Sequence, residues 1–265
     1  MDNQDNLAIE VVGATVYLGG RQIIKNLSWQ LEKGARCFIL GANGAGKTTL
    51  VKMLMGYSWP VYGAKVRVLG ETFGNVSLIE LRKRIAWVSP FMQRWSDPET
   101  TGLEMVVSGI ESTIGLFRKI LPHEEEQAME IMERLNCTHL KDQSMVTMSS
   151  GEQVKVLIAR ALMTKPELVI LDEPSVYLDI AGREFLLNAI SDMAAKHPET
   201  TIVFITQRIE DIMPEFKTGM ILKEGIIEAI GNREDVLTEE NLSKAFDLNI
   251  KLMQGKNGRL WSMIQ

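Results

Sequence analysis

One stretch of this sequence decides its fold: Gly41-Ala42-Asn43-Gly44-Ala45-Gly46-Lys47-Thr48. It matches the pattern G-x-x-x-x-G-K-[ST] in full. The apolar run Arg36–Leu40 precedes it as a predicted strand, and Lys47–Met55 follows with helical spacing until Gly56. Glycines let backbone amides turn toward phosphate groups, and a helix start adds partial positive charge. The stretch therefore predicts a nucleotide-phosphate site, with ATP as the expected ligand, in a P-loop NTPase fold.

Individual residues of this loop have expected roles. Lys47 places a point charge between the β- and γ-phosphates, and the Thr48 hydroxyl is a ligand for Mg²⁺. The other residues expected to line the phosphates are Gly41, Ala42, Asn43, Gly44, Ala45, Gly46 and Thr49.

Two carboxylates follow a second apolar run, Leu168–Leu171. A continuous apolar run of this length is typical of a buried parallel strand, which delivers Asp172 to its carboxyl end. There Asp172 is expected to hold Mg²⁺, and Glu173 is expected to polarise the attacking water. The alternative is that both carboxylates only cap the strand end before Pro174. The phosphate loop on the same chain favours the catalytic interpretation.

The rest of the chain indicates an α/β fold with a mostly parallel core sheet. An N-terminal antiparallel β subdomain and a helical insert are expected to accompany it. Strands are predicted at residues 7–12, 27–31, 66–69, 85–88 and 201–205, and helices at 124–135, 154–163 and 181–195.

Composition narrows the classes of function. The chain has 265 residues, a net charge of -5 and a pI near 5.4, which argues against a broad nucleic-acid surface. Two cysteines, Cys37 and Cys137, predict neither a zinc site nor a disulfide framework. No secretory leader and no apolar stretch of ~20 residues is found. The chain is expected to be cytoplasmic and not itself membrane-spanning.

A third motif lies between the other two. The turn Ser149-Ser150-Gly151-Glu152-Gln153 precedes a helix expected at Val154–Met163. By itself such a small-residue turn usually only caps a helix. In order, however, the phosphate loop, this turn and the Asp172-Glu173 strand resemble the ATP-binding cassette (ABC) family of ATPases. The resemblance covers about residues 7–248, with a helical subdomain at about 95–165 and a short C-terminal extension at 249–265.

The resemblance implies a composite site. In this family two nucleotide-binding domains clasp two ATP molecules head to tail, so the expected partner is a second copy or a related ABC ATPase. Ser149 and Gly151, within a turn that also contains Ser150 and Glu152, would touch the γ-phosphate bound by the partner. Asp179 matches the loop that crosses the interface. Tyr17, with Leu18 as a one-residue alternative, matches the aromatic residue that stacks on adenine.

Three departures from the family pattern stand out. Gln207 occupies the position of the usual histidine; its amide can donate to phosphate but cannot be a cation, which predicts slower turnover with binding retained. Ser150 replaces the usual first glycine of the turn, and Met148 the leucine. Pro90 replaces the glutamine after strand 85–88. Gln93 is then a candidate for Mg²⁺ and the attacking water, or else an exposed loop residue.

Four short segments, residues 56–60, 108–109, 112–116 and 208–212, are similar to molybdate-transport-type and photorepair-type cassettes of this family. The segment 234–242 is similar to iron-complex and vitamin B12 importer ATPases. They imply an ATP-hydrolysing subunit that drives a membrane permease from the inner face of the cell membrane. A soluble ABC ATPase acting as a regulatory switch is the alternative, favoured by Gln207 and the altered turn. An ATP-binding module with negligible turnover is a third interpretation, against which Glu173 argues.

Overall fold

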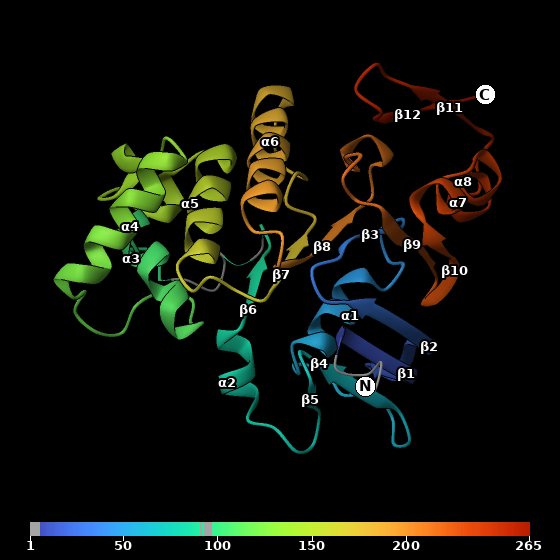
Figure 1. The fold of residues 1–265 in the computed structure, drawn as a ribbon, viewed down its shortest axis with the longest axis horizontal. Coiled ribbons are helices and arrows are strands. Elements are labelled where there is room, and N and C mark those ends of the chain that lie inside the picture. Colours follow the sequence, from blue (N-terminus) through green and yellow to red (C-terminus); the bar gives the residue numbers. More distant parts are fainter. Residues whose placement is uncertain (1–5, 91, 93–96) are drawn as a thin grey trace. The chain divides into compact units, whose positions relative to one another are not determined.

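The structure, a computed structural model, describes residues 6–90, 92 and 97–265 (Figure 1). The chain divides into two compact units. The first comprises Met1–Leu81 and His197–Gln265, and the second comprises Arg82–Lys196. Within the described residues, no helix is both long and apolar enough to cross a membrane.

The first unit begins with the predicted antiparallel β subdomain, a sheet whose strand order is β2-β1-β4-β5. Its strands are β1 (Leu7–Leu18), β2 (Arg21–Glu32), β4 (Lys65–Val68) and β5 (Glu71–Thr72). Leu27, Trp29 and Leu31 are buried while their neighbours Ser28 and Gln30 are exposed, the alternation of a half-buried strand. Both β1 and β2 are longer than predicted, because bulges in β1 interrupt the apolar alternation without ending the pairing.

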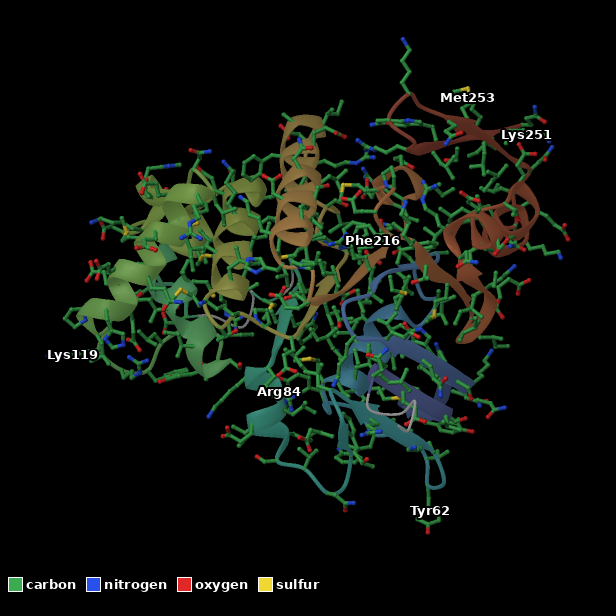
Figure 2. The ribbon with its side chains drawn as sticks, viewed as in Figure 1. Tyr62, Arg84, Lys119, Phe216, Lys251 and Met253 are labelled. Carbon is green, nitrogen blue, oxygen red and sulfur yellow. The ribbon has the colours of Figure 1, made fainter. Side chains whose placement is uncertain are left out.

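The second sheet of this unit has the order β10-β9-β3-β8. Its strands are β3 (Arg36–Leu40), β8 (Thr201–Thr206), β9 (Thr218–Lys223) and β10 (Ile226–Asn232). Both β8 and β9 run parallel to β3, whereas β9 and β10 form an antiparallel hairpin. Phe38 of β3, Phe204 of β8 and Phe216 (labelled in Figure 2) are fully buried, and the rings of Phe204 and Phe216 lie 5.4 Å apart. Such burial stabilises the unit by about 2 kcal/mol per ring.

The remaining elements of the first unit surround these sheets. They are α1 (Lys47–Leu54), η6 (Ile209–Asp211), α7 (Arg233–Val236), α8 (Glu239–Phe246), β11 (Ile250–Gln254) and β12 (Leu260–Ile264). Helix α2 (Leu78–Lys83) begins in this unit. Strands β11 and β12 pair antiparallel from Ile250↔Ile264 to Gln254↔Leu260, so residues 250–264 form a terminal hairpin.

The second unit contains a parallel strand pair and most of the helices. Its elements are β6 (Ile85–Val88), α3 (Gly102–Val107), η3 (Ser108–Glu111), α4 (Pro122–Arg134), η4 (Thr138–Leu140), η5 (Met145–Thr147), α5 (Ser150–Leu162), β7 (Leu168–Asp172) and α6 (Ile180–Lys196). The start of α4 is fixed by Pro122 and by Glu124, which accepts from Leu121 N–H and from Arg118. These bonds, Arg118 foremost, lower the pKa of Glu124 to about 2.

Candidate functional site

The phosphate loop lies in the first unit, between β3 and α1. Gly44 and Gly46 have positive φ angles of 82° and 103°, and Gly46 is the N-cap residue of α1. Because a glycine cap has no side-chain acceptor, the first N–H groups of the helix stay available to an anion. The predicted strand, turn and helix start are therefore all present in one unit.

The Lys47 ammonium group is held by the loop itself. Its Nζ donates to the carbonyl oxygens of Gly41 at 2.7 Å and of Ala42 at 2.8 Å, and the residue is only 4% exposed. A buried ammonium group needs such acceptors to offset its lost hydration. The positive charge is thus fixed within the turn, while Thr48 beside it is partly exposed and Thr49 is buried.

Neighbouring strands brace this loop. Gly41 N–H donates to Thr206 O at 3.3 Å, and Gly225 N–H donates to Ala45 O at 2.9 Å. A Cβ atom on Gly41 would lie 2.4 Å from Leu222 O, closer than any side chain tolerates. The first unit therefore leaves no room for a side chain at position 41. The tip residues Asn43 and Gly44 are exposed.

The candidate adenine-stacking residues lie at the end of β1. Tyr17 is 52% exposed and Leu18 is 43% exposed. Successive residues of a strand face opposite sides, so only one of these two side chains can meet a given ligand. The aromatic ring of Tyr17 is the better stacking surface.

Gln207 lies in the same unit, directly after β8. The turn around it is closed by Thr206, whose Oγ1 accepts from Arg208 N–H at 3.0 Å and lies 3.4 Å from Asp211 Oδ2. Asp211 is fully buried, whereas Gln207 is partly exposed. The backbone on both sides of Gln207 is thus held while its amide side chain reaches solvent.

The two candidate catalytic carboxylates lie in the second unit. All five residues of β7 are buried, and the last of them, Asp172, is 2% exposed. Glu173 follows with a φ of +51°, a left-handed backbone that is uncommon for a residue with a side chain. Such strain persists only where surrounding structure maintains it, and it gathers at functional sites.

The structure corrects the predicted start of the helix that follows the Ser149–Gln153 turn. Helix α5 begins at Ser150 rather than at Val154, so Ser150, Gly151 and Glu152 form its first turn. Ser149 is the N-cap: its N–H and Oγ both donate to Glu152 Oε2 at 2.8 Å, and its Oγ accepts from Glu152 N–H at 3.4 Å. This capping box explains the earlier start, and the bonds from Ser149 lower the pKa of the Glu152 carboxyl.

Gly151 differs from Gly41 in its surroundings. A Cβ atom at Gly151 would meet no heavy atom within 4 Å, and its φ is an ordinary helical one. Glycine within a helix costs roughly 1 kcal/mol relative to alanine. Nothing in its own unit therefore requires a glycine at this position.

Asp179 has a structural contact of its own. Its Oδ1 accepts from Gly182 N–H at 2.7 Å at the start of α6, and the residue is exposed.

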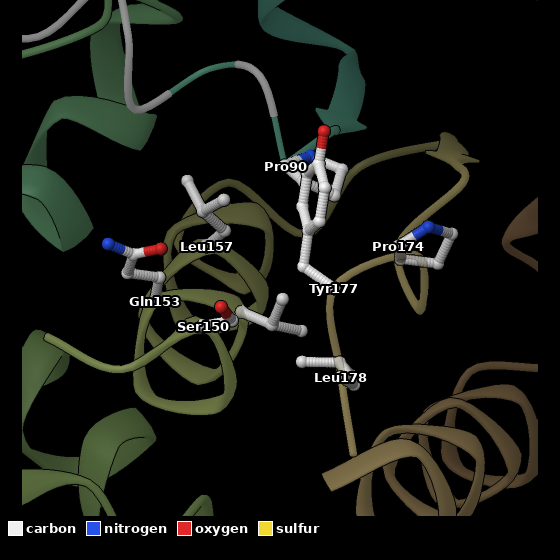
Figure 3. A pocket seen from close by; sticks show the side chains of 8 residues that line it. Pro90, Ser150, Gln153, Leu157, Pro174, Tyr177 and Leu178 are labelled. Atoms are coloured by element: carbon white, nitrogen blue, oxygen red, sulfur yellow. The ribbon is translucent and has the colours of Figure 1, made fainter.

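The remaining candidate, Gln93, lies outside the described residues. Nearby Pro90 helps to line a small apolar pocket in the second unit, with residues from α5 and from the segment after β7, Tyr177 among them (Figure 3).

The described residues contain no group of three or more His, Cys, Asp or Glu that could hold a metal ion. Cys37 and Cys137 are both free and buried, and burial raises the pKa of their thiols to about 12 and about 11. Thr48 offers a hydroxyl oxygen in the first unit and Asp172 offers carboxylate oxygens in the second, and oxygen donors are the kind that a hard cation such as Mg²⁺ prefers.

The comparisons with known proteins address this set of motifs. The sequence profile of the ABC transporter family matches residues 24–176, which include the phosphate loop, the α5 turn and both carboxylates. The chain belongs to the ABC transporter family.

Relatives of this family cover nearly the whole chain. The Uncharacterized ABC transporter ATP-binding protein YlmA of Bacillus subtilis is 36% identical over 93% of this chain and 94% of its own. The Molybdate import ATP-binding protein MolC of Haemophilus influenzae is 30% identical, with coverage of 91% and 88%. A solved inward-facing structure of a protein assigned to the metal-chelate type of ABC transporter is 28% identical, with a TM-score of 0.79 over 98% of this chain and 97% of that one.

The chain is thus an ATP-binding subunit of an ABC transporter with the P-loop NTPase fold. Sequence reasoning missed two supports of its site. The first is the β9–β10 turn under the phosphate loop, for which Glu224-Gly225, both with positive φ, were an available hairpin signal. The second is the Ser149–Glu152 capping box, for which the S-x-x-E spacing was the signal.

Proposed function

We propose that this ABC subunit hydrolyses ATP slowly in a composite site completed by a second chain, and that it drives a membrane importer. The observation that carries the proposal is the phosphate loop, in which the start of α1 and the fixed Lys47 charge lie together within one unit. Membership of the family supports hydrolysis in general.

The residues take the following roles in the proposal. Lys47 and the loop amides bind the β- and γ-phosphates, and Tyr17 stacks on adenine. Thr48 and Asp172, with Gln93 as a further candidate, would hold Mg²⁺, which would neutralise charge on the phosphate oxygens. Glu173 orients and polarises the attacking water.

The α5 turn is proposed to face the ATP of the other chain. Gly151 supports this, because an exposed helix start with no internal need for glycine suits close approach by another molecule. Ser149, Ser150 and Glu152 would lie around the same phosphate, and Asp179 would reach the interface. The expected partner is a second copy or a related ABC subunit.

The side chain of Gln207 is the reason that we expect slow ATP hydrolysis. Its amide can donate one hydrogen bond to the γ-phosphate, but it carries no positive charge at any pH. A charged donor stabilises phosphate more strongly than a neutral one. ATP binding is therefore expected to be retained and turnover to be slow, and Gln207→His is expected to raise it.

Import rather than a soluble role is supported by the molybdate import relative and by the inward-facing transporter structure. The subunit would then work at the inner face of the cell membrane beside a separate permease. The rival is a soluble switch, which Gln207 and the altered α5 turn favour. Purification from gently solubilised membranes distinguishes them: a hydrophobic subunit that elutes with this chain supports import, and hydrolysis stimulated by nucleic acid without such a partner supports the switch.

Hydrolysis itself is tested by Glu173→Gln. Phosphate release should fall by about 10² or more, because the water loses its base, while ATP binding is retained. ATP with Mg²⁺ should then trap this variant as a dimer, visible by light scattering. The matched control is Glu126→Gln, an exposed residue of the same unit, which should behave as wild type. Equal phosphate release by wild type and Glu173→Gln would remove Glu173 from its role.

A further inference from the structure

The terminal hairpin contains one buried charge. Most residues of β11 and β12 are exposed or partly exposed, yet Arg259, directly before β12, is only 7% exposed. Its guanidinium donates to the carbonyl oxygen of Glu210 twice, from Nε at 3.1 Å and from Nη2 at 2.8 Å. It also lies 5.3 Å from the ring of Trp261. A planar guanidinium with two donors on one oxygen fixes the position of that oxygen.

The carbonyl that Arg259 holds belongs to the turn after Gln207. Glu210 is the middle residue of η6, and Asp211 N–H at its end donates back to Arg208 O at 3.2 Å. Arg208 N–H is in turn bonded to Thr206 Oγ1 at 3.0 Å. A short chain of hydrogen bonds therefore joins Arg259 to the two residues that flank Gln207.

The hairpin turn that presents Arg259 is itself anchored. Arg259 N–H donates to Asn257 Oδ1 at 3.2 Å, and Gly255 N–H donates to Arg259 O at 2.8 Å. Arg233 Nη2 donates to Gly258 O at 3.2 Å. The hairpin is thus tied by hydrogen bonds, both within its own turn and to Arg233 of the first unit.

We propose that Arg259 is a positioning residue: the terminal hairpin holds the Gln207 turn in the geometry used for hydrolysis. The proposal rests on the role of Gln207 given above. It makes residues 249–265 a regulatory element, because any partner that lifts the hairpin would release the turn and slow turnover. Catalysis is sensitive to such release, since a misplacement of about 1 Å can cost about 10²-fold.

The test is Arg259→Ala against Lys256→Ala, which removes the same charge from an exposed residue of the same turn. Arg259→Ala should lower kcat roughly tenfold with little change in KM for ATP, a part of the loss that a 1 Å misplacement causes. Lys256→Ala should match wild type. Arg259→Lys should recover only part of the rate, because an ammonium group cannot reproduce the planar pair of donors.

A double-mutant cycle tests whether the effect passes through Gln207. In a Gln207→Ala background, Arg259→Ala should cause no further loss of kcat. An equal loss in both backgrounds, or equal rates for Arg259→Ala and Lys256→Ala, would overturn the proposal.

Hydrogen exchange separates this proposal from the proposed hydrolysis. In Arg259→Ala the amides of residues 208–212 should exchange faster than in wild type, with or without ATP, while those of β3 are unchanged. Faster exchange in a protein that releases no phosphate would contradict hydrolysis but not the hairpin contact. Unchanged exchange would overturn the contact whatever the rate. If Arg259→Ala does not fold, Arg259→Lys carries both measurements.

Discussion

The phosphate loop of the first unit and the first turn of α5 in the second each lie at the start of a helix, but they are built differently. The loop is braced from within: Gly41 fits against Leu222 O, and Lys47 is bonded to carbonyl oxygens of the loop. The α5 turn satisfies its own cap through Ser149 and Glu152, and the surroundings of Gly151 are open. The contrast teaches that the fold of its own unit requires a glycine at position 41, whereas position 151 has no such requirement and leaves its glycine available for the contact proposed with a second chain.

The largest loss of activity is expected when the positive charge of Lys47 is removed from the phosphate loop. Lys47→Ala removes the only side-chain cation of the loop, and phosphate release should fall by about 10²–10³ together with ATP affinity. Nucleotide titration and phosphate release measure the two losses. Lys33→Ala, an exposed lysine of the same unit, is the control. Full ATP affinity in Lys47→Ala would break the assignment of the loop as the phosphate site.

Gly41→Ala tests whether the fold of the first unit requires a glycine at position 41. Gly41→Ala places Cβ against a backbone oxygen at 2.4 Å, so the first unit must shift, at a cost of about 1–3 kcal/mol. Denaturant unfolding should show this loss without any nucleotide. Unchanged stability would mean that the loop is not braced as the structure describes.

Gly151→Ala tests whether the proposed contact with a second chain requires a glycine at position 151. Gly151→Ala should leave the chain as stable or more stable by up to about 1 kcal/mol, because alanine favours a helix. Turnover should nevertheless fall about tenfold or more, since a methyl group now stands where another molecule approaches. Thermal unfolding and phosphate release are measured together. Lost stability with normal turnover would reverse the comparison.

The smallest effect concerns the cap of the α5 turn. Glu152→Ala should destabilise the second unit by about 1 kcal/mol at pH 7. The pKa of Glu152 is lower in the folded chain than its usual value, so its stabilisation is present above that usual value and is lost as the pH falls below it. The difference from wild type should therefore shrink below about pH 4.5, the usual range of a glutamate. A difference independent of pH would show that the carboxylate charge plays no part.

Much of this architecture could be read from the sequence. The strands β3, β7 and β8 are largely apolar runs, and the motif residues follow directly after β3 and β8 or end β7. These signals are local, so the order of residues suffices to find them. The Asp172-Glu173 pair was placed correctly at the end of β7.

Other features depend on contacts between distant residues. The start of α5 was predicted four residues late, because Gly151 reads as a turn residue until the capping box is noticed. The terminal hairpin was expected only as a short extension, since its exposed strands lack a clear apolar alternation. Arg259 carried no signal, because its partner is the backbone of Glu210, 49 residues away.

The two carbonyl bonds of Lys47 also bear on which anions the loop accepts. An incoming phosphate competes with these two carbonyl oxygens for the three N–H donors of the ammonium group, so affinity is a difference between two sets of hydrogen bonds. A single inorganic anion offers few oxygens with which to compensate for the exchange. A polyphosphate chain spans the lysine and the amides of the helix start together. We therefore expect the loop to favour ligands by length, with inorganic phosphate competing poorly against ATP.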